Sequence, residues 1–376
     1  MDVVRESAAS GRVVLWEESA RDGAQAKTLM TPGFRVELAR ETGRVFGSDG
    51  PRHVVFAAGF PAVCGEEFEA VRRVAMEAEG AVSIAAVCRG AHRDLKQAVA
   101  SVRGSRHARV MVVVPASEAM AQVMVHRTAS EALVGGVDLV KRARDLDEGV
   151  AVDVCLADAS RADHSLMAHY AQAMTGAGAG LVVLADTVGA QLPLSCGEMF
   201  NRVRTEAGSE VVLASHLHND LGLGLANTLQ ALAAGVRVVS SSWLGIAERA
   251  GMVATEQLLF LLARRTADVL GADAAPWWTP PDLTRLPAIA RMVADETGVP
   301  LSVTTPIVGT GVATISTGSV RPPACGLPRS AGGANGPAPS TDRRWRARSP
   351  PRPPTQATRP RTPPQPRRAG GRPGPR

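Results

Sequence analysis

Aromatic residues are scarce in this sequence: Phe, Trp and Tyr make up only 3% of its 376 residues, although apolar residues of all kinds reach 45%. The core must therefore be built from Val, Leu, Ala and Ile. No run of about 18 apolar residues occurs, so we expect no membrane-spanning helix and no membrane partner. Residues 1–10 are polar and of mixed charge, without the apolar stretch of a secretory signal.

Patterned cysteines are also lacking. The five cysteines, Cys64, Cys88, Cys155, Cys196 and Cys325, are scattered and show no Cys-x-x-Cys spacing. We therefore expect reduced thiols and a cytoplasmic protein.

Lysine occurs only at positions 27, 96 and 141, and charge is distributed unevenly. Residues 321–376 contain 13 Arg, one acidic residue and 15 of the 26 prolines, whereas residues 1–320 carry 29 basic and 35 acidic side chains. Such a composition cannot support a core, which predicts a disordered Pro/Arg-rich tail behind a mildly acidic body. Alternatives are attachment to nucleic acid through arginine, which we do not expect, and a tail read in a shifted frame of a GC-rich gene.

Short Val-rich runs alternate with helix-like stretches through the body of the chain. The eight runs are residues 12–16, 53–58, 81–88, 108–114, 150–156, 180–185, 210–215 and 236–243, and helix-like stretches include 65–79, 116–134, 165–175 and 226–234. Apolar strands separated by helices predict an α/β fold with a parallel sheet covered on both faces. Eight such units over about 250 residues fit a closed (β/α)8 TIM barrel, with an open doubly wound sheet as the alternative. We expect a catalytic barrel at 1–270, a short helical segment at 271–320 and the tail at 321–376.

Polar side chains follow the predicted strands at their carboxyl ends, where the active sites of such barrels lie. His216 and His218 follow the seventh run, and in an extended chain residues two apart point to the same face. Asp22 follows the first run, which only one strand separates from the seventh in a closed barrel. Two imidazoles and a carboxylate are typical of a catalytic divalent-metal site, and Arg21 would add a positive charge beside it. The alternatives are polar strand-end histidines and a local surface ion pair between Arg21 and Asp22.

At these residues the sequence resembles the superfamily of metal-dependent acyltransferases and lyases that contains 2-isopropylmalate synthase, homocitrate synthase and 3-hydroxy-3-methylglutaryl-CoA lyase. The motifs that carry the resemblance are Arg-Asp-Gly-Ala-Gln at 21–25, Gly-Phe-Pro-Ala at 59–62, Asp-Thr-Val-Gly at 186–189, His-Leu-His-Asn-Asp-Leu-Gly at 216–222 and Glu-Arg-Ala-Gly at 248–251. The last motif is typical of the synthases, and the Cys-containing Gly-rich loop of the lyases is not found. The resemblance covers about residues 12–310.

The resemblance implies an acyltransferase that condenses acetyl-CoA with a 2-oxo acid in a Claisen-type reaction, with a divalent metal such as Mn²⁺, Mg²⁺, Zn²⁺ or Co²⁺. It implies that Asp22, His216 and His218 hold the metal and that Arg21 and Glu248 are catalytic. Thr187 and Gln25 are expected to contact the substrate, and Arg161 and Arg89, expected near strand ends, would hold a second anionic group. We also expect small-molecule substrates and a homodimer.

The sequence departs from the family pattern around the expected oxo-acid pocket. Cys155 and Ala157 stand where the synthases usually carry Ser and Glu, Met120 stands for a His, and Met252 stands for an Asn. We therefore expect not leucine biosynthesis but a divergent synthase of secondary metabolism that uses oxaloacetate, phosphonopyruvate or phosphinopyruvate. The alternatives are a lyase or aldolase on the same metal site and a truncated, inactive homologue.

Overall fold

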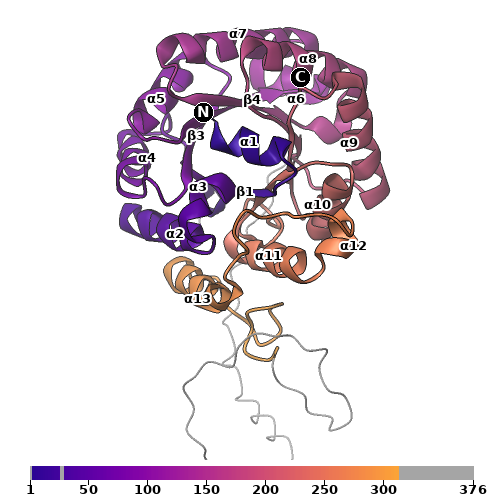
Figure 1. Cartoon of the computed structure of the whole chain (residues 1–376). Helices are drawn as coiled ribbons and strands as arrows, with labels where there is room; N and C mark the ends of the chain where they lie inside the picture. The colour runs from indigo at the N-terminus through magenta and orange to yellow at the C-terminus, as the bar shows by residue number, and fades with distance from the viewer. Residues whose placement is uncertain (1, 26–28, 313–376) are drawn as a thin grey trace, which may run out of the picture. The chain divides into compact units, whose positions relative to one another are not determined.

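Eight parallel strands close into a barrel in the order in which they occur along the chain (Figure 1). The computed structural model describes residues 2–25 and 29–312. The strands are β1 (Val14–Glu17), β2 (Val54–Gly59), β3 (Ser83–Arg89), β4 (Ala108–Pro115), β5 (Ala151–Ala157), β6 (Val182–Asp186), β7 (Leu213–Leu217) and β8 (Val238–Ser241). The predicted TIM barrel is confirmed, and the open sheet is wrong because β1 pairs along its whole length with β8.

Every predicted run overlaps a strand, but several strands continue past the apolar run. β1 extends to Glu17, β6 to Asp186 and β7 to Leu217. The ladder continues because its hydrogen bonds come from the backbone, which does not depend on side-chain polarity. Glu17, Asp186 and His216 are therefore held by the barrel itself rather than by loops.

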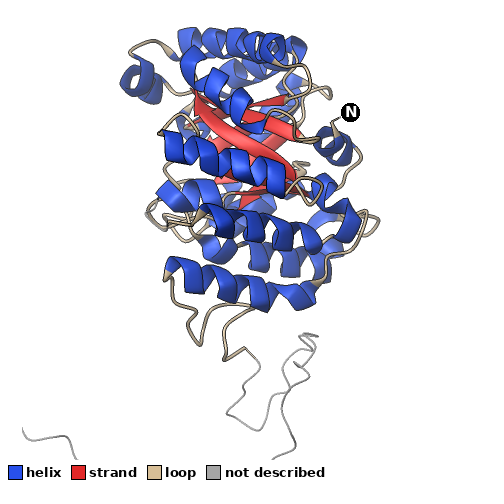
Figure 2. Ribbon diagram, turned by 90° about the vertical axis from the view of Figure 1, so that its left-hand side faces the viewer, coloured by secondary structure: helices blue, strands red, loops and turns tan. Residues whose placement is uncertain are grey.

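Helices cover the outside of the strands, and the first helix lies across one end of the barrel (Figure 1 and Figure 2). They are α1 (Val3–Ala9), α2 (Pro32–Arg44), α3 (Gly50–His53), α4 (Gly65–Glu77), α5 (His92–Val102), α6 (Glu118–Val125), α7 (Ala129–Leu146), α8 (His164–Ala177), α9 (Pro193–Ala207), α10 (Gly224–Ala233), α11 (Thr255–Arg264), α12 (Thr266–Leu270) and α13 (Leu286–Thr297).

The helix predicted over residues 116–134 is divided in the structure. His126 adopts the left-handed conformation, with φ at 54°, where α6 ends. Thr128 then begins α7 with a capping box, in which the side chains of Thr128 and Glu131 each accept the other's backbone N–H. Such a cap is worth about 1 kcal/mol, and the prediction of one continuous helix overlooked it.

The core has two parts, because both faces of each strand are buried. Outward-facing side chains such as Leu15 and Phe56 pack against the helices. Inward-facing side chains fill the barrel, where Trp16 and Met111 lie among small residues such as Ala57. Small aliphatic residues around one large ring fill this narrow space, so few aromatic residues are needed.

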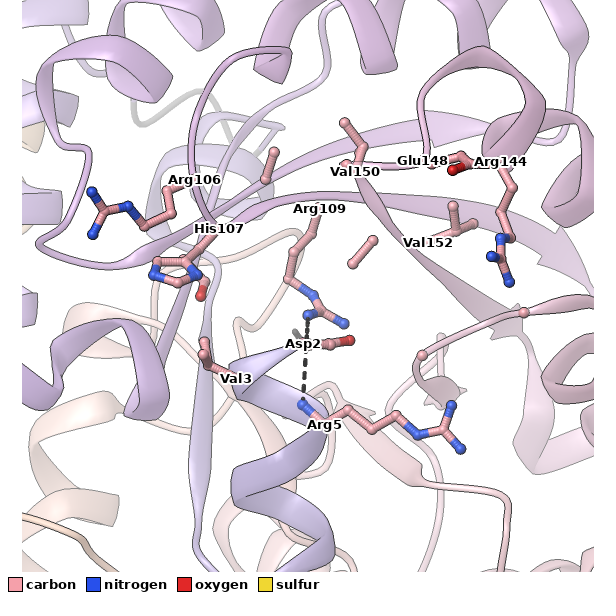
Figure 3. Close-up of a pocket in the computed structure, with 16 residues that line it drawn as sticks. Asp2, Val3, Arg5, Arg106, His107, Arg109, Arg144, Glu148, Val150 and Val152 are labelled. Carbon is pink, nitrogen blue, oxygen red and sulfur yellow. Dashed lines mark hydrogen bonds and ion pairs between the residues drawn. The ribbon is translucent and has the colours of Figure 1, made fainter.

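The helix α1 covers the amino-terminal end of the barrel. Its Val4 packs into the inner core, and Asp2 caps the helix while pairing with Arg109 of β4. Arg109, 3% exposed, also donates to Asp153 of β5 at 2.7 and 2.9 Å. Figure 3 shows Arg109 and Asp2 in the wall of a cavity of about 280 Å³. This cluster ties the first helix to two strands at the end of the barrel opposite the carboxyl ends.

The segment after the barrel packs on its outside. The helix α13 contacts α2 and the short turn η4 (Trp243–Gly245), and its Leu286, Ile289 and Val293 join the outer core. All described residues fall within the unit Met1–Pro328, and the predicted tail lies outside the described residues. Among the helices described, none is long and apolar enough to cross a membrane.

Candidate metal centre

The strand β1 leads into a π-helical turn, η1 (Ser19–Gly23), that carries Arg21 and Asp22. The backbone N–H groups of Asp22 and Gly23 both reach the carbonyl oxygen of Glu18, at 2.8 and 3.3 Å. Widened turns of this kind are rare and often occur at functional sites. The Arg21–Asp22 pair, 3.2 Å apart, is buried, with 12% and 2% of the two side chains exposed, and so is not a surface ion pair.

The two histidines come from β7. His216 lies within the strand and His218 follows it directly. Because Ala214 lies in the inner core, the alternation of side chains directs His216 and His218 into the barrel as well. Both are buried.

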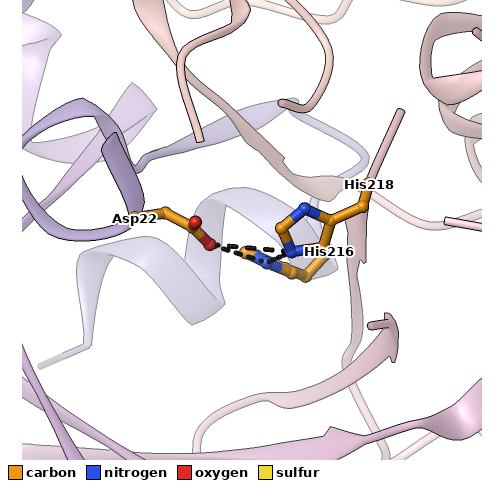
Figure 4. A group of neighbouring side chains, drawn as sticks. All are labelled: Asp22, His216 and His218. Carbon is orange, nitrogen blue, oxygen red and sulfur yellow. Dashed lines mark hydrogen bonds and ion pairs between the residues drawn. The ribbon is translucent and has the colours of Figure 1, made fainter. Parts of the chain in front are cut away.

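Asp22, His216 and His218 converge at the carboxyl ends of the strands (Figure 4). Oδ2 of Asp22 lies 3.3 Å from Nε2 of His216 and 3.7 Å from Nε2 of His218, and the two Nε2 atoms are 3.3 Å apart. Atoms that bind one metal ion at about 2.1 Å are spaced by about 3.0–3.4 Å. The donor set of one carboxylate and two imidazoles therefore fits a divalent metal. Within residues 2–25 and 29–312, no other three His, Cys, Asp or Glu side chains form such a group.

The loop after β8 supports Asp22 through its backbone. The N–H of Glu248 donates to Oδ1 of Asp22 at 2.8 Å, which leaves Oδ2 directed at the imidazoles. The carboxylate of Glu248 is 46% exposed and lies 3.7 Å from Arg249. Gly251 turns this loop with φ at 84°, where a Cβ would lie 2.1 Å from the carbonyl oxygen of Gly245. The Glu-Arg-Ala-Gly segment thus reaches the cluster through a peptide N–H, and the described contacts do not bring the Glu248 carboxylate to it.

Arg21 is fixed beside the cluster by three acceptors. Its Nε donates to Oε2 of Glu18 at 2.7 Å and its Nη1 donates to Oε1 of Gln25 at 2.9 Å. Its Nη2 lies 3.2 Å from Oδ2 of Asp22. The structure therefore brings Arg21 and Gln25 together, with Gln25 serving as an acceptor for the guanidinium.

Burial and charge together set the protonation of the cluster. Burial alone would raise the pKa of Asp22, but Arg21 and the imidazoles outweigh it and hold that pKa well below its usual range. Glu18 behaves likewise, because Arg21 and His216 outweigh burial and lower its pKa. Burial, reinforced by His216, lowers the pKa of His218 to about 4. At neutral pH the cluster accordingly offers ionised carboxylates and a neutral His218 imidazole.

A second network, at the ends of β5 and β6, positions Thr187. The hydroxyl oxygen of Thr187 accepts the backbone N–H of Asp158 at 2.8 Å, which leaves its own proton free to be donated. Asp158 is fully buried with φ at 62° and accepts from Nε of Arg161 at 2.8 and 3.0 Å and from Ser117. Arg161 is thereby attached to the same strand ends, with its side chain 52% exposed.

Arg89 lies apart from the cluster. It ends β3 as expected, but its side chain is 62% exposed, pairs with Asp94 of α5 at 2.6 Å and lines a cavity of about 640 Å³. No described contact joins it to Asp22, His216 or His218. A position at the end of a strand does not fix the direction of a long side chain.

Glu18 is the site residue that the sequence analysis missed. It is fully buried and contacts both Arg21 and His216. The alternation along β1 carried the signal: Trp16 faces the inner core, so Glu18, two residues later, points the same way.

A closed (β/α)8 barrel with a buried carboxylate and two histidines at its strand ends defines the class of TIM-barrel proteins with a candidate metal-dependent active site. Residues 13–293 match the family described as HMGL-like, and the chain therefore belongs to the HMGL-like family.

Similar sequences include two 2-isopropylmalate synthases. The chain is 32% identical over 299 residues to that of Acidimicrobium ferrooxidans, covering 79% of this chain and 55% of the relative. It is 33% identical over 263 residues to 2-isopropylmalate synthase 1 of Caldanaerobacter subterraneus subsp. tengcongensis, covering 68% of this chain and 62% of the relative. The chain thus spans less than two thirds of the length of these relatives.

Solved structures with the same fold include two lyases. The hydroxymethylglutaryl-CoA lyase of Pseudomonas aeruginosa has a TM-score of 0.62 at 22% identity, covering 77% of this chain and 94% of that chain. The HMG-CoA lyase of Brucella melitensis has a TM-score of 0.61 at 19% identity, covering 76% of this chain and 99% of that chain. At these identities the similarity concerns the fold.

Proposed function

We propose that this chain catalyses a metal-dependent Claisen-type condensation of acetyl-CoA with a 2-oxo acid that carries a second anionic group, such as oxaloacetate, phosphonopyruvate or phosphinopyruvate. The methyl carbon of acetyl-CoA would lose a proton and bond to the 2-oxo carbon, whose C=O π bond breaks as its oxygen takes up a proton to become a hydroxyl group, and water would hydrolyse the thioester to release CoA. The observation that carries the proposal is the buried group of Asp22, His216 and His218 with Arg21 fixed beside it. Similarity to 2-isopropylmalate synthases supports the reaction class.

The buried group would hold the metal and Arg21 would stabilise developing charge. Asp22, His216 and His218 would bind a divalent ion, which when bound supplies Lewis-acid polarisation of the 2-oxo group. Arg21 would hold its positive charge where the 2-oxo oxygen becomes negative. Because Glu18 and Gln25 already engage Arg21, the guanidinium needs little rearrangement during the reaction.

The network at β5 and β6 would bind the rest of the 2-oxo acid. Thr187 would donate its hydroxyl proton to the carboxylate next to the 2-oxo group, since its oxygen already accepts the N–H of Asp158. Arg161, attached to Asp158, would bind the second anionic group. A branched apolar acid such as 2-oxoisovalerate has no group for this arginine. Arg89 would contribute only if Asp94 released it.

The experiment measures CoA thiol released from acetyl-CoA with Mn²⁺ or Mg²⁺ and each 2-oxo acid in turn. We expect oxaloacetate or its phosphorus analogues to outperform 2-oxoisovalerate, and a chelator to stop the release. Arg161→Gln should raise KM for the dianionic acid by about tenfold or more, whereas Arg202→Gln, which removes an exposed arginine paired with Glu206 on α9, should not.

Two results would contradict the proposal at different levels. A preference for 2-oxoisovalerate would show that the pocket assignment is wrong while the reaction class stands. Failure of every 2-oxo acid to release CoA from metal-loaded protein would refute the condensation and return the lyase and the inactive homologue to consideration.

A further inference from the structure

We infer that Glu18 is a positioning residue of the metal centre: its buried carboxylate orients His216 and Arg21 together and thereby sets the affinity of the site for a divalent cation. The inference rests on the proposed function, because that proposal supplies the metal.

Glu18 lies between the two groups that it would position. None of its surface is exposed to solvent. Its Oε2 accepts Nε of Arg21 at 2.7 Å, and its Oε1 lies 3.4 Å from Nδ1 of His216. Each carboxylate oxygen thus faces a different partner, and a shift of the side chain would affect both.

The contact with His216 decides which ring nitrogen faces the cluster. Nδ1 of His216 faces Glu18, whereas Nε2 lies 3.3 Å from Oδ2 of Asp22 and 3.3 Å from Nε2 of His218. Oε1 of Glu18 accepts no hydrogen bond among the described residues, and its negative charge beside Nδ1 favours the tautomer with the proton there, which leaves the Nε2 lone pair for a metal. Nδ1 of His218 is buried and has no hydrogen-bond partner among the described residues. Glu18 therefore orients the imidazole of His216 but not that of His218.

Glu18 also holds Arg21, whose positive charge lies beside Asp22 and would oppose the binding of a metal cation there. Arg21 lies 3.2 Å from Oδ2 of Asp22, which is also the oxygen nearest both imidazoles. Pairing Nε of Arg21 with Glu18 gives the guanidinium a second anchor. The Glu18 carboxylate beside Nε of Arg21 offsets the guanidinium charge next to Oδ2 of Asp22, which favours a divalent cation at this buried position.

The neighbouring Glu17 offers a matched control. It lies next to Glu18 and is equally buried, but its carboxylate contacts Ser19 and the N–H of Trp243 rather than the cluster. A variant at Glu17 therefore makes the same kind of substitution one residue earlier in the chain without touching His216 or Arg21.

The test titrates Mn²⁺ alone into metal-free wild type, Glu18→Gln, Glu18→Asp and Glu17→Gln, with free Mn²⁺ measured by electron paramagnetic resonance. Glu18→Gln removes the charge, whereas Glu18→Asp keeps it but is one methylene too short to reach both partners. We expect both Glu18 variants to bind Mn²⁺ about 10–100-fold more weakly and Glu17→Gln to bind as wild type. At saturating Mn²⁺, both Glu18 variants should lower kcat more than they raise KM, because Arg21 is displaced.

The outcomes separate this inference from the function on which it rests. If Glu18→Asp binds Mn²⁺ as tightly as wild type, charge alone matters and positioning is refuted; if Glu17→Gln weakens binding equally, the effect is not specific to Glu18. If wild type itself binds no Mn²⁺, the metal centre of the proposed function falls together with its positioning residue.

Discussion

His216 and His53 are both buried imidazoles, but their surroundings assign them different tasks. His216 meets Glu18, Asp22 and His218 at the strand ends. The Nδ1 of His53 lies 2.8 Å from the carbonyl oxygen of Val13, and its Nε2 accepts the N–H of Trp278 at 2.9 Å. The partners, and not burial, separate a candidate ligand from a structural side chain.

Replacing His216 should therefore affect metal binding and turnover, whereas replacing His53 should affect stability. His216→Ala should lose bound divalent metal and turnover while the barrel stays folded, because only the cluster is disrupted. His53→Ala should keep bound metal but lose about 1–3 kcal/mol of stability, since the carbonyl of Val13 and the N–H of Trp278 lose their partner. Elemental analysis and thermal unfolding of both variants would check this. An active, fully metallated His216→Ala protein would show that His216 is not a metal ligand.

Glu256 should make the stability of the protein depend on pH. It is fully buried at the start of α11, its Oε2 accepts the N–H of Leu244 at 3.1 Å, and burial raises its pKa from 4.5 to about 7. Between these pH values the unfolded chain releases a proton that the folded chain keeps. The stabilisation from the neutral carboxyl is thus complete below pH 4.5 and is lost as the pH rises through 7.

Glu256→Gln, which cannot ionise, removes this dependence. The unfolding free energy of wild type minus that of the variant should fall by about 3 kcal/mol across this range. Urea unfolding at several pH values measures the difference, and a constant or rising difference would contradict the assignment.

At the scale of elements, α1 depends on a charged cluster for its attachment. Asp2 both caps the helix, accepting the N–H groups of Val4 and Arg5, and pairs with Arg109. Arg109 in turn bridges to Asp153, so that the helix, β4 and β5 share one buried group.

Asp2→Ala should cost more than the loss of a helix cap. Asp163→Ala is the matched control, because Asp163 caps α8 by accepting the N–H of Leu166 and makes no ion pair with an arginine in the described part of the chain. We expect about 1 kcal/mol for Asp163→Ala and a larger loss for Asp2→Ala. Chemical unfolding measures both, and equal losses would show that the ion pair contributes nothing.

At the scale of the whole molecule, the body should not depend on residues 321–376. These residues lie outside the described part of the chain, and their composition, with 15 prolines and 13 arginines, provides almost no aliphatic surface. A chain ending at Val320 should therefore melt within about one degree of the full chain and release CoA at the same rate. A lower melting temperature for the shortened chain would show that the tail stabilises the barrel.

The sequence determined the eight strands of the barrel and the candidate metal ligands Asp22, His216 and His218, because both depend on periodicity. Eight apolar runs in alternation with helices predict a parallel sheet of eight strands, whose closure the pairing of β1 with β8 shows, and the spacing of His216 and His218 places both on one face. The tertiary structure decided what depends on the direction of long side chains and on loop backbone. It turned Arg89 toward Asp94, brought the N–H of Glu248 rather than its carboxylate to Asp22, and placed Glu18 between Arg21 and His216. The contacts of Glu248 with Asp22 and of Glu18 with His216 join residues that lie far apart along the chain, and only the closed barrel brings them together.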